Sequence, residues 1–138
     1  MARPTRILIS ATDDDERAAM RQALECRDFE IVDAADFTRA YALLLESQFD
    51  LIVIQSAGSP QEGIEFIGCV RATPGLTGIL ILVIAEWGTG HPTLALSAGA
   101  DAYEAANGSN PVDLDCLRTS IERLLSRQVA AANYETYD

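Results

Sequence analysis

The chain of 138 residues is long enough to bury a sizeable core as one domain and too short for two. Apolar residues make up 49% of it and charged residues 22%, as in ordinary globular proteins, which excludes disorder as its main state. Acidic residues outnumber basic ones by 21 to 10, and the net charge of −11 repels nucleic-acid phosphates and anionic lipids. We therefore expect neither nucleic acid nor membrane among its partners.

The sequence favours a cytoplasmic location. Its longest apolar run, residues 79–85, is far shorter than the roughly 20 residues of a membrane-spanning helix. Residues 1–6 do not resemble the apolar core of a secretory signal. The three cysteines, Cys26, Cys69 and Cys116, have the spacing of neither a disulfide framework nor a zinc site. We expect each to be reduced and to act as a small apolar residue of a helix.

Short apolar runs rich in β-branched residues alternate along the chain with segments of helical spacing. In chain order these patterns predict a strand at residues 7–9, a helix at 14–26, a strand at 31–32, a helix at 37–47, a strand at 51–54, a helix at 62–72, a strand at 79–84, a helix at 92–98, a strand at 102–104 and a helix at 111–127. The strand runs are continuously apolar, which is typical of parallel strands covered on both faces. The predicted fold is a flavodoxin-like (βα)5 three-layer α/β sandwich, a five-stranded parallel sheet with helices on both faces.

This domain is expected to span residues 1–127, with residues 128–138 as a C-terminal helix extension or a disordered tail. Active sites of such folds lie in the loops beyond the carboxyl ends of the strands. The loop after the first predicted strand carries an acidic run, residues 13–16. It could hold Mg²⁺, which binds carboxylate oxygens. We favour helix capping, in which Asp13 is the N-cap and Glu16 completes a capping box, because capping accounts for the whole run without a ligand.

Several local patterns, in their order and spacing, resemble the receiver domain of bacterial two-component response regulators. They are FEIV at residues 29–32, AAD at 34–36, DLIVI at 50–54, GIEF at 63–66, RATP at 71–74 and GADAY at 99–103. The resemblance covers about residues 6–127. In that family an aspartate at the end of the third strand accepts a phosphoryl group. Two acids after the first strand help to hold Mg²⁺, while a hydroxyl after the fourth strand and a lysine after the fifth bind the phosphoryl oxygens.

The sequence departs from the family at each of these positions. Gln55 stands at the phosphoacceptor position, and its neutral amide is not a phosphoryl nucleophile. The acid pair falls on Ala11 and Thr12, with Asp13 nearby, so that a shift of one residue would supply one acid. The hydroxyl position falls on Ala85, or on Ile84 if the gap lies elsewhere, and the lysine position falls on Ala106 or Asn107. All ten basic residues are arginine, so no realignment supplies a lysine. The resemblance therefore implies a degenerate receiver, or pseudo-receiver, with no catalytic residue, bound metal or cofactor.

The function that we expect is phosphorylation-independent protein–protein interaction in a signalling system of the two-component or phosphorelay type, without enzymatic activity. In the family, the fourth helix, fifth strand and fifth helix form the output and dimerisation face, here residues 92–98, 102–104 and 111–127. We expect a protein partner or a homodimer to use this face. Tyr103 matches the aromatic residue that reports activation there, although a half-buried tyrosine on an edge strand explains it equally well.

Two alternatives stay open. One is true phosphotransfer with Asp13 or Asp14 as an unorthodox acceptor. The other is a (βα)5 domain that binds a small ligand in its loops. The run Gly88-Thr89-Gly90 before a predicted helix is a weak indication of a phosphate cradle, and a mobile loop explains it better.

Overall fold

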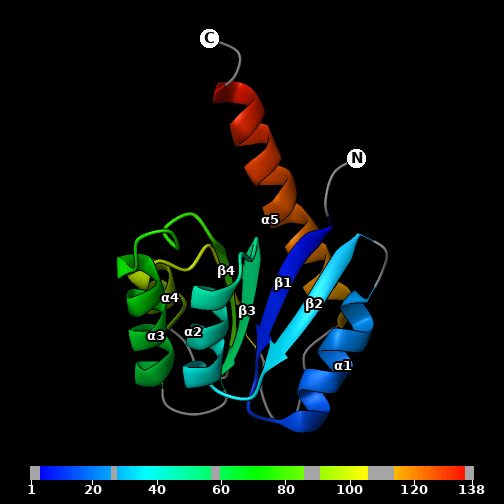
Figure 1. The fold of residues 1–138 in the computed structure, drawn as a ribbon, viewed down its shortest axis with the longest axis vertical. Coiled ribbons are helices and arrows are strands. Elements are labelled where there is room, and N and C mark those ends of the chain that lie inside the picture. Colours follow the sequence, from blue (N-terminus) through cyan, green and yellow to red (C-terminus); the bar gives the residue numbers. More distant parts are fainter. Residues whose placement is uncertain (1–3, 26–27, 57–59, 86–90, 106–113, 136–138) are drawn as a thin grey trace.

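A computed structural model describes residues 4–25, 28–56, 60–85, 91–105 and 114–135. Strands and helices alternate along the chain, as the sequence patterns predict (Figure 1). The elements are β1 (Thr5–Ser10), α1 (Asp14–Leu24), β2 (Phe29–Ala34), α2 (Phe37–Glu46), β3 (Leu51–Ser56), α3 (Pro60–Ala72), β4 (Leu80–Ala85), α4 (His91–Ala98), β5 (Ala102–Ala105) and α5 (Leu114–Glu135). No helix within these ranges is long and apolar enough to cross a membrane.

The five strands form one parallel sheet in the order β2-β1-β3-β4-β5. Strands β3 and β4 are flanked on both sides by other strands, and their apolar residues are almost completely buried. This is the environment that continuous apolar runs predict, so the predicted parallel sheet is confirmed. Strand β2 is longer than its short apolar run indicates, because it pairs with β1 along its whole length from Phe29 to Ala34. Because β2 lies at the edge of the sheet and includes polar residues, its apolar run in the sequence is shorter than the strand.

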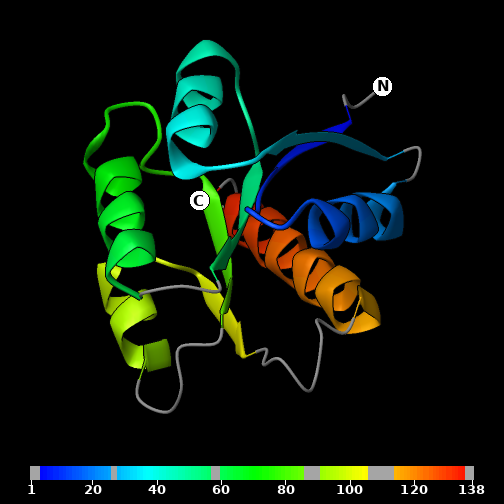
Figure 2. The same cartoon turned by 90° about the horizontal axis from the view of Figure 1, so that it is seen from below.

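Helices cover the sheet on both faces and enclose two separate cores (Figure 2). Helices α2, α3 and α4 bury residues such as Leu44, Ile67 and Ala95 against one face. Helices α1 and α5 bury residues such as Met20 and Ile121 against the other. The predicted three-layer sandwich is therefore confirmed, with three helices on one side and two on the other.

Helix α5 continues to Glu135, well past residue 127, where the apolar periodicity of the sequence ends. Its last turns extend beyond the edge of the sheet at which the strands begin (Figure 1). Residues 128–135 are thus helical, while residues 136–138 lie outside the described residues. Helix α1 ends at Leu24, with Glu25 as its C-cap, slightly earlier than predicted.

Arg71, near the end of α3, ties that helix to the segments around β4 and β5. Its guanidinium donates to the carbonyls of Thr77, Ile79 and Gly99 and forms an ion pair of 2.9 Å with Asp101. Gly99 has a φ of +126°, and a Cβ there would lie 2.6 Å from Cγ of Arg71. Only glycine fits this close approach without displacing the arginine.

Candidate functional site

The carboxyl edge of the sheet brings together three positions that the family resemblance identifies as altered. Gln55 lies near the end of β3 and is paired with Ile84 of β4, next to Ala85. Ala11 follows β1 directly, and its backbone N–H donates to the carbonyl of Ala34 at 3.1 Å. Because parallel strands all end at the same edge, these residues of distant segments share one site.

The side chain of Gln55 is bonded across this edge to the first turn of α1. Its Nε2 donates to Oε2 of Glu16, which lies 39 residues earlier in the chain. Both residues are half-buried. A hydrogen bond to an ionised carboxylate is stronger than one between neutral groups, so this pair joins β3 to α1.

The acidic run at residues 13–16 was predicted to cap α1, and the structure confirms one part of that prediction. Asp13 has an extended backbone and its Oδ1 accepts a hydrogen bond of 2.9 Å from the N–H of Glu16, which confirms it as the N-cap of α1. The predicted capping box is wrong in its second half. The carboxylate of Glu16 binds Gln55 instead of reaching back to the N-cap, because β3 lies within reach of the first turn of α1.

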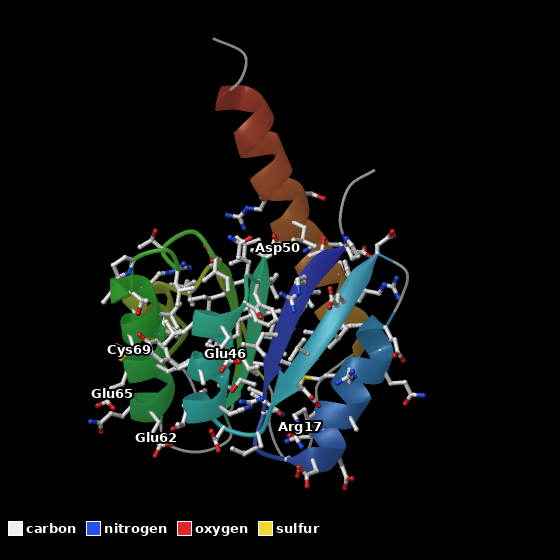
Figure 3. All side chains as sticks on the ribbon, viewed as in Figure 1. Arg17, Glu46, Asp50, Glu62, Glu65 and Cys69 are labelled. Carbon is white, nitrogen blue, oxygen red and sulfur yellow. The ribbon has the colours of Figure 1, made fainter. Side chains whose placement is uncertain are left out.

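Arg17 completes this edge, and the sequence analysis did not identify it. Its guanidinium donates to the carbonyl of Ala11 at 2.8 Å, and forms ion pairs with Asp14 at 2.5 Å and Asp33 at 3.3 Å. The hydrogen bond with Asp14 raises the pKa of Arg17 above its usual value. Figure 3 places it near the start of α1. The spacing of Asp14 and Arg17, three residues apart on a helix, was the signal available in the sequence.

The residues at this edge do not fit Mg²⁺, which receiver domains use in phosphotransfer. Mg²⁺ needs hard oxygen ligands, carboxylates above all. The positions of the acid pair hold Ala11 and Thr12, and the Ala11 carbonyl already accepts from a cationic side chain. Asp13 is exposed and occupied in capping. Within the described ranges, no group of three or more His, Cys, Asp or Glu side chains could hold a metal ion.

Tyr103 is half-buried on the edge strand β5, and its hydroxyl donates to the backbone carbonyl of Ala85 at 3.3 Å. The tyrosine therefore contacts the backbone carbonyl of the residue that the resemblance aligns with the hydroxyl position of receivers. The predicted lysine position, Ala106, lies outside the described residues, as do Trp87 and the run Gly88–Gly90.

A cavity of about 580 Å³ opens beside this edge, between α2 and α3. It is lined by Ser10, Ala11, Thr12, Asp36, Phe37, Thr38, Tyr41, Gln55, Glu62, Glu65, Phe66 and Cys69. Cys69 is a free cysteine of a helix, as predicted, and it is exposed. It lies on the side of α3 that borders the cavity, so helical position alone did not decide its burial. No local pattern in the sequence indicates the cavity, because four separate segments form it.

The sheet order and the two helical layers define the flavodoxin-like α/β fold of response-regulator receiver domains. A two-component response regulator from Clostridium difficile superposes with a TM-score of 0.77 at 23% identity, over 90% of this chain and 98% of that one. The chemotaxis response regulator CheY4 of Vibrio cholerae gives a TM-score of 0.76 at 20% identity, over 87% and 98%. The receiver domain of a DNA-binding response regulator from Colwellia psychrerythraea gives 0.76 at 19%, over 88% and 98%. The sequence matches no protein-family model and no curated protein.

Proposed function

We propose that this chain is a receiver-like signalling domain of a two-component or phosphorelay system that acts through phosphorylation-independent protein–protein interaction and has no enzymatic activity. The observation that carries the proposal is Gln55, an amide bonded to Glu16 at the end of β3, where a phosphoacceptor aspartate is required. The solved structures of similar fold are response regulators, which supports a role in signalling.

The chemistry of phosphotransfer supports the part of this proposal that makes the interaction independent of phosphorylation. Transfer needs a nucleophile, a metal that neutralises the phosphate charge, and donors on the transferred oxygens. An amide nitrogen that donates to a carboxylate cannot serve as the nucleophile. Arg17 supplies a fixed positive charge beside Ala11, which opposes a divalent cation at the same place. The chain has no lysine for the phosphoryl oxygens.

The same contacts stabilise the acidic side chains of this edge without a ligand. Clustered carboxylates repel one another, and in phosphorylatable receivers a metal and a phosphoryl group relieve that repulsion. Here the Gln55 amide and the Arg17 guanidinium bind the acidic side chains Glu16, Asp14 and Asp33 directly. The Tyr103 hydroxyl donates to the backbone carbonyl of Ala85, and this hydrogen bond does not require a hydroxyl side chain at that residue.

The face formed by α4, β5 and α5 is where we place the binding of a protein partner or of a second copy of the chain. Leu94 and Leu96 of α4 are 47% and 49% exposed, although large apolar side chains favour burial. Arg123 and Arg127 are exposed on α5, four residues apart and therefore on one side of that helix. Exposed apolar side chains on α4 and exposed basic ones on α5 suit a partner surface with apolar and acidic residues.

Mass spectrometry of the intact protein tests the absence of phosphotransfer. After incubation with Mg²⁺ and a small phosphodonor, we expect no phosphoryl adduct and no change in the fluorescence of Trp87, the only tryptophan. Gln55→Asp alone should not create an adduct, because the metal-binding acids, the hydroxyl and the lysine are still missing. An adduct on Asp13 or Asp14 of the unmodified chain would instead establish the unorthodox acceptor.

A further inference from the structure

The cavity between α2 and α3 has the size and construction of a small-molecule site. Its volume of about 580 Å³ lies inside the range of roughly 300–1,000 Å³ that is usual for ligand pockets. Its wall comes from both helices, and its inner end reaches Gln55 at the carboxyl edge of the sheet. It lies away from the α4-β5-α5 face and does not include Glu16 or Arg17 among its lining residues.

The apolar part of the wall is aromatic and held in a fixed arrangement. The rings of Phe37 on α2 and Phe66 on α3 are stacked, with centroids 4.6 Å apart and an interplanar angle of 9°. Tyr41 lines the same cavity, and its hydroxyl is bonded to Oγ1 of Thr73 at 2.8 Å, which links α2 to the end of α3. The half-buried rings of Phe37 and Tyr41 thus offer surface to an occupant, while the buried Phe66 supports Phe37 from behind.

The polar part of the wall is negatively charged. Asp36, Glu62 and Glu65 contribute carboxylates, and none of the lining residues in the described ranges is basic. Asp36 caps α2 by accepting from the N–H of Arg39 at 2.8 Å, and Glu65 accepts from Nε2 of Gln61 at 3.1 Å. Glu62 and Glu65 are exposed residues of α3 that line the cavity, and Cys69 follows them along the helix (Figure 3).

From this combination we infer that the cavity binds a small organic cation, an ammonium or guanidinium group carried on an aromatic or aliphatic body. Aromatic faces attract cations through the ring quadrupole, and nearby carboxylates add Coulomb attraction. The apolar body would lie against Phe37 and Tyr41, and the cationic group beside Glu62 and Glu65. Anionic ligands, phosphates included, are disfavoured by the same charges. This inference goes beyond the proposed function and does not depend on it.

A charge series of probes with one shared body tests the inference. Phenethylamine is the cation, 2-phenylethanol the neutral analogue and 3-phenylpropionate the anion. We expect calorimetry and saturation-transfer NMR at neutral pH to detect saturable binding of the amine. The alcohol should bind about tenfold more weakly and the carboxylate not at all. Backbone amide shifts caused by the amine should concentrate on the residues that line the cavity.

Three variants locate the site. The double substitution Glu62→Gln and Glu65→Gln should weaken amine binding about tenfold, and Phe37→Leu should weaken all binding of the aromatic body. The matched control is Glu25→Gln with Glu46→Gln, which likewise removes two negative charges, from exposed residues outside this cavity. It should leave the affinity unchanged. Thermal melting confirms that each variant is folded.

The inference is overturned if the amine fails to saturate at millimolar concentration, if the carboxylate binds as well as the amine, or if the double variant keeps the affinity of the unmodified protein. None of these outcomes affects the proposed function, whose test is the phosphoryl adduct. An adduct would likewise leave the charge preference of the cavity unchanged.

Discussion

The contact between Gln55 and Glu16 requires a hydrogen-bond donor on the side chain of residue 55. The amide Nε2 can donate to the Glu16 carboxylate, whereas a carboxylate oxygen at the same place cannot. The pair is half-buried, so solvent only partly screens it. A receiver that carries an acid at this position would face repulsion that the present chain avoids.

Replacing Gln55 by the isosteric acid should therefore destabilise the fold. We expect Gln55→Glu to lower the free energy of unfolding by about 1–2 kcal/mol at neutral pH, because a donor becomes a second carboxylate. Exchanging the two residues, Glu16→Gln with Gln55→Glu, restores a donor and an acceptor and should recover most of the loss. Urea unfolding measures both. Equal stability of the single and exchanged variants would show that the bond contributes nothing.

Helix α1 begins where it does because Asp13 caps it. The acidic first turn, Asp14 to Glu16, complements the positive end of the helix dipole. Two of its side chains also have a partner at this edge, Asp14 in Arg17 and Glu16 in Gln55. The run is thus explained by helix formation and by contacts to Arg17 and Gln55, without a metal ion.

Removing the cap tests this explanation. Asp13→Ala should cost about 1 kcal/mol of unfolding free energy, the usual effect of a lost N-cap. Asp15→Ala is the control, because Asp15 is exposed in the same turn and contributes only to the helix dipole, about 0.5 kcal/mol or less. Chemical denaturation with and without Mg²⁺ gives the measurement. Stabilisation of the unmodified chain by Mg²⁺ that Asp13→Ala abolishes would contradict capping and favour a metal site.

The whole molecule carries a net charge of −11, yet its basic residues are not evenly spread. On α5, Arg118 forms an ion pair of 3.3 Å with Glu122 of the same helix. Arg123 and Arg127 lie on the other side of the buried stripe formed by Leu117, Ile121 and Leu124. Arg123 and Arg127 are therefore the arginines of this helix that we propose for contact with an acidic partner surface.

Association through this face should depend on both groups. Leu94→Ser with Leu96→Ser, and separately Arg123→Glu with Arg127→Glu, should each weaken self-association in sedimentation velocity about tenfold or more. The controls are Leu45→Ser, at a leucine 59% exposed on α2, and Arg39→Glu, also on α2. Both should behave like the unmodified chain. Unchanged association of the folded test variants, or equal weakening by the controls, would exclude this face.

The order and kind of the ten elements could be predicted from the sequence, because continuous apolar runs and helical spacing are local properties. The absence of a lysine for the phosphoryl oxygens was equally predictable, because the sequence contains no lysine at all. Element ends were less predictable. The length of β2 depends on pairing with β1, and α5 continues through residues 128–135 without the apolar pattern of its first turns.

The site depended on contacts that no local pattern contains. Gln55 was identified in the sequence, but its partner Glu16 lies 39 residues away, and only the packing of α1 beside β3 brings the two together. Arg17 binds the Ala11 carbonyl because the chain turns between β1 and α1 and brings the first turn of the helix back to the end of the strand. The cavity between α2 and α3 exists only once both helices are seated on the sheet. Side-chain direction between distant segments is set by tertiary packing, whereas periodicity in the sequence sets only which face of each element is buried.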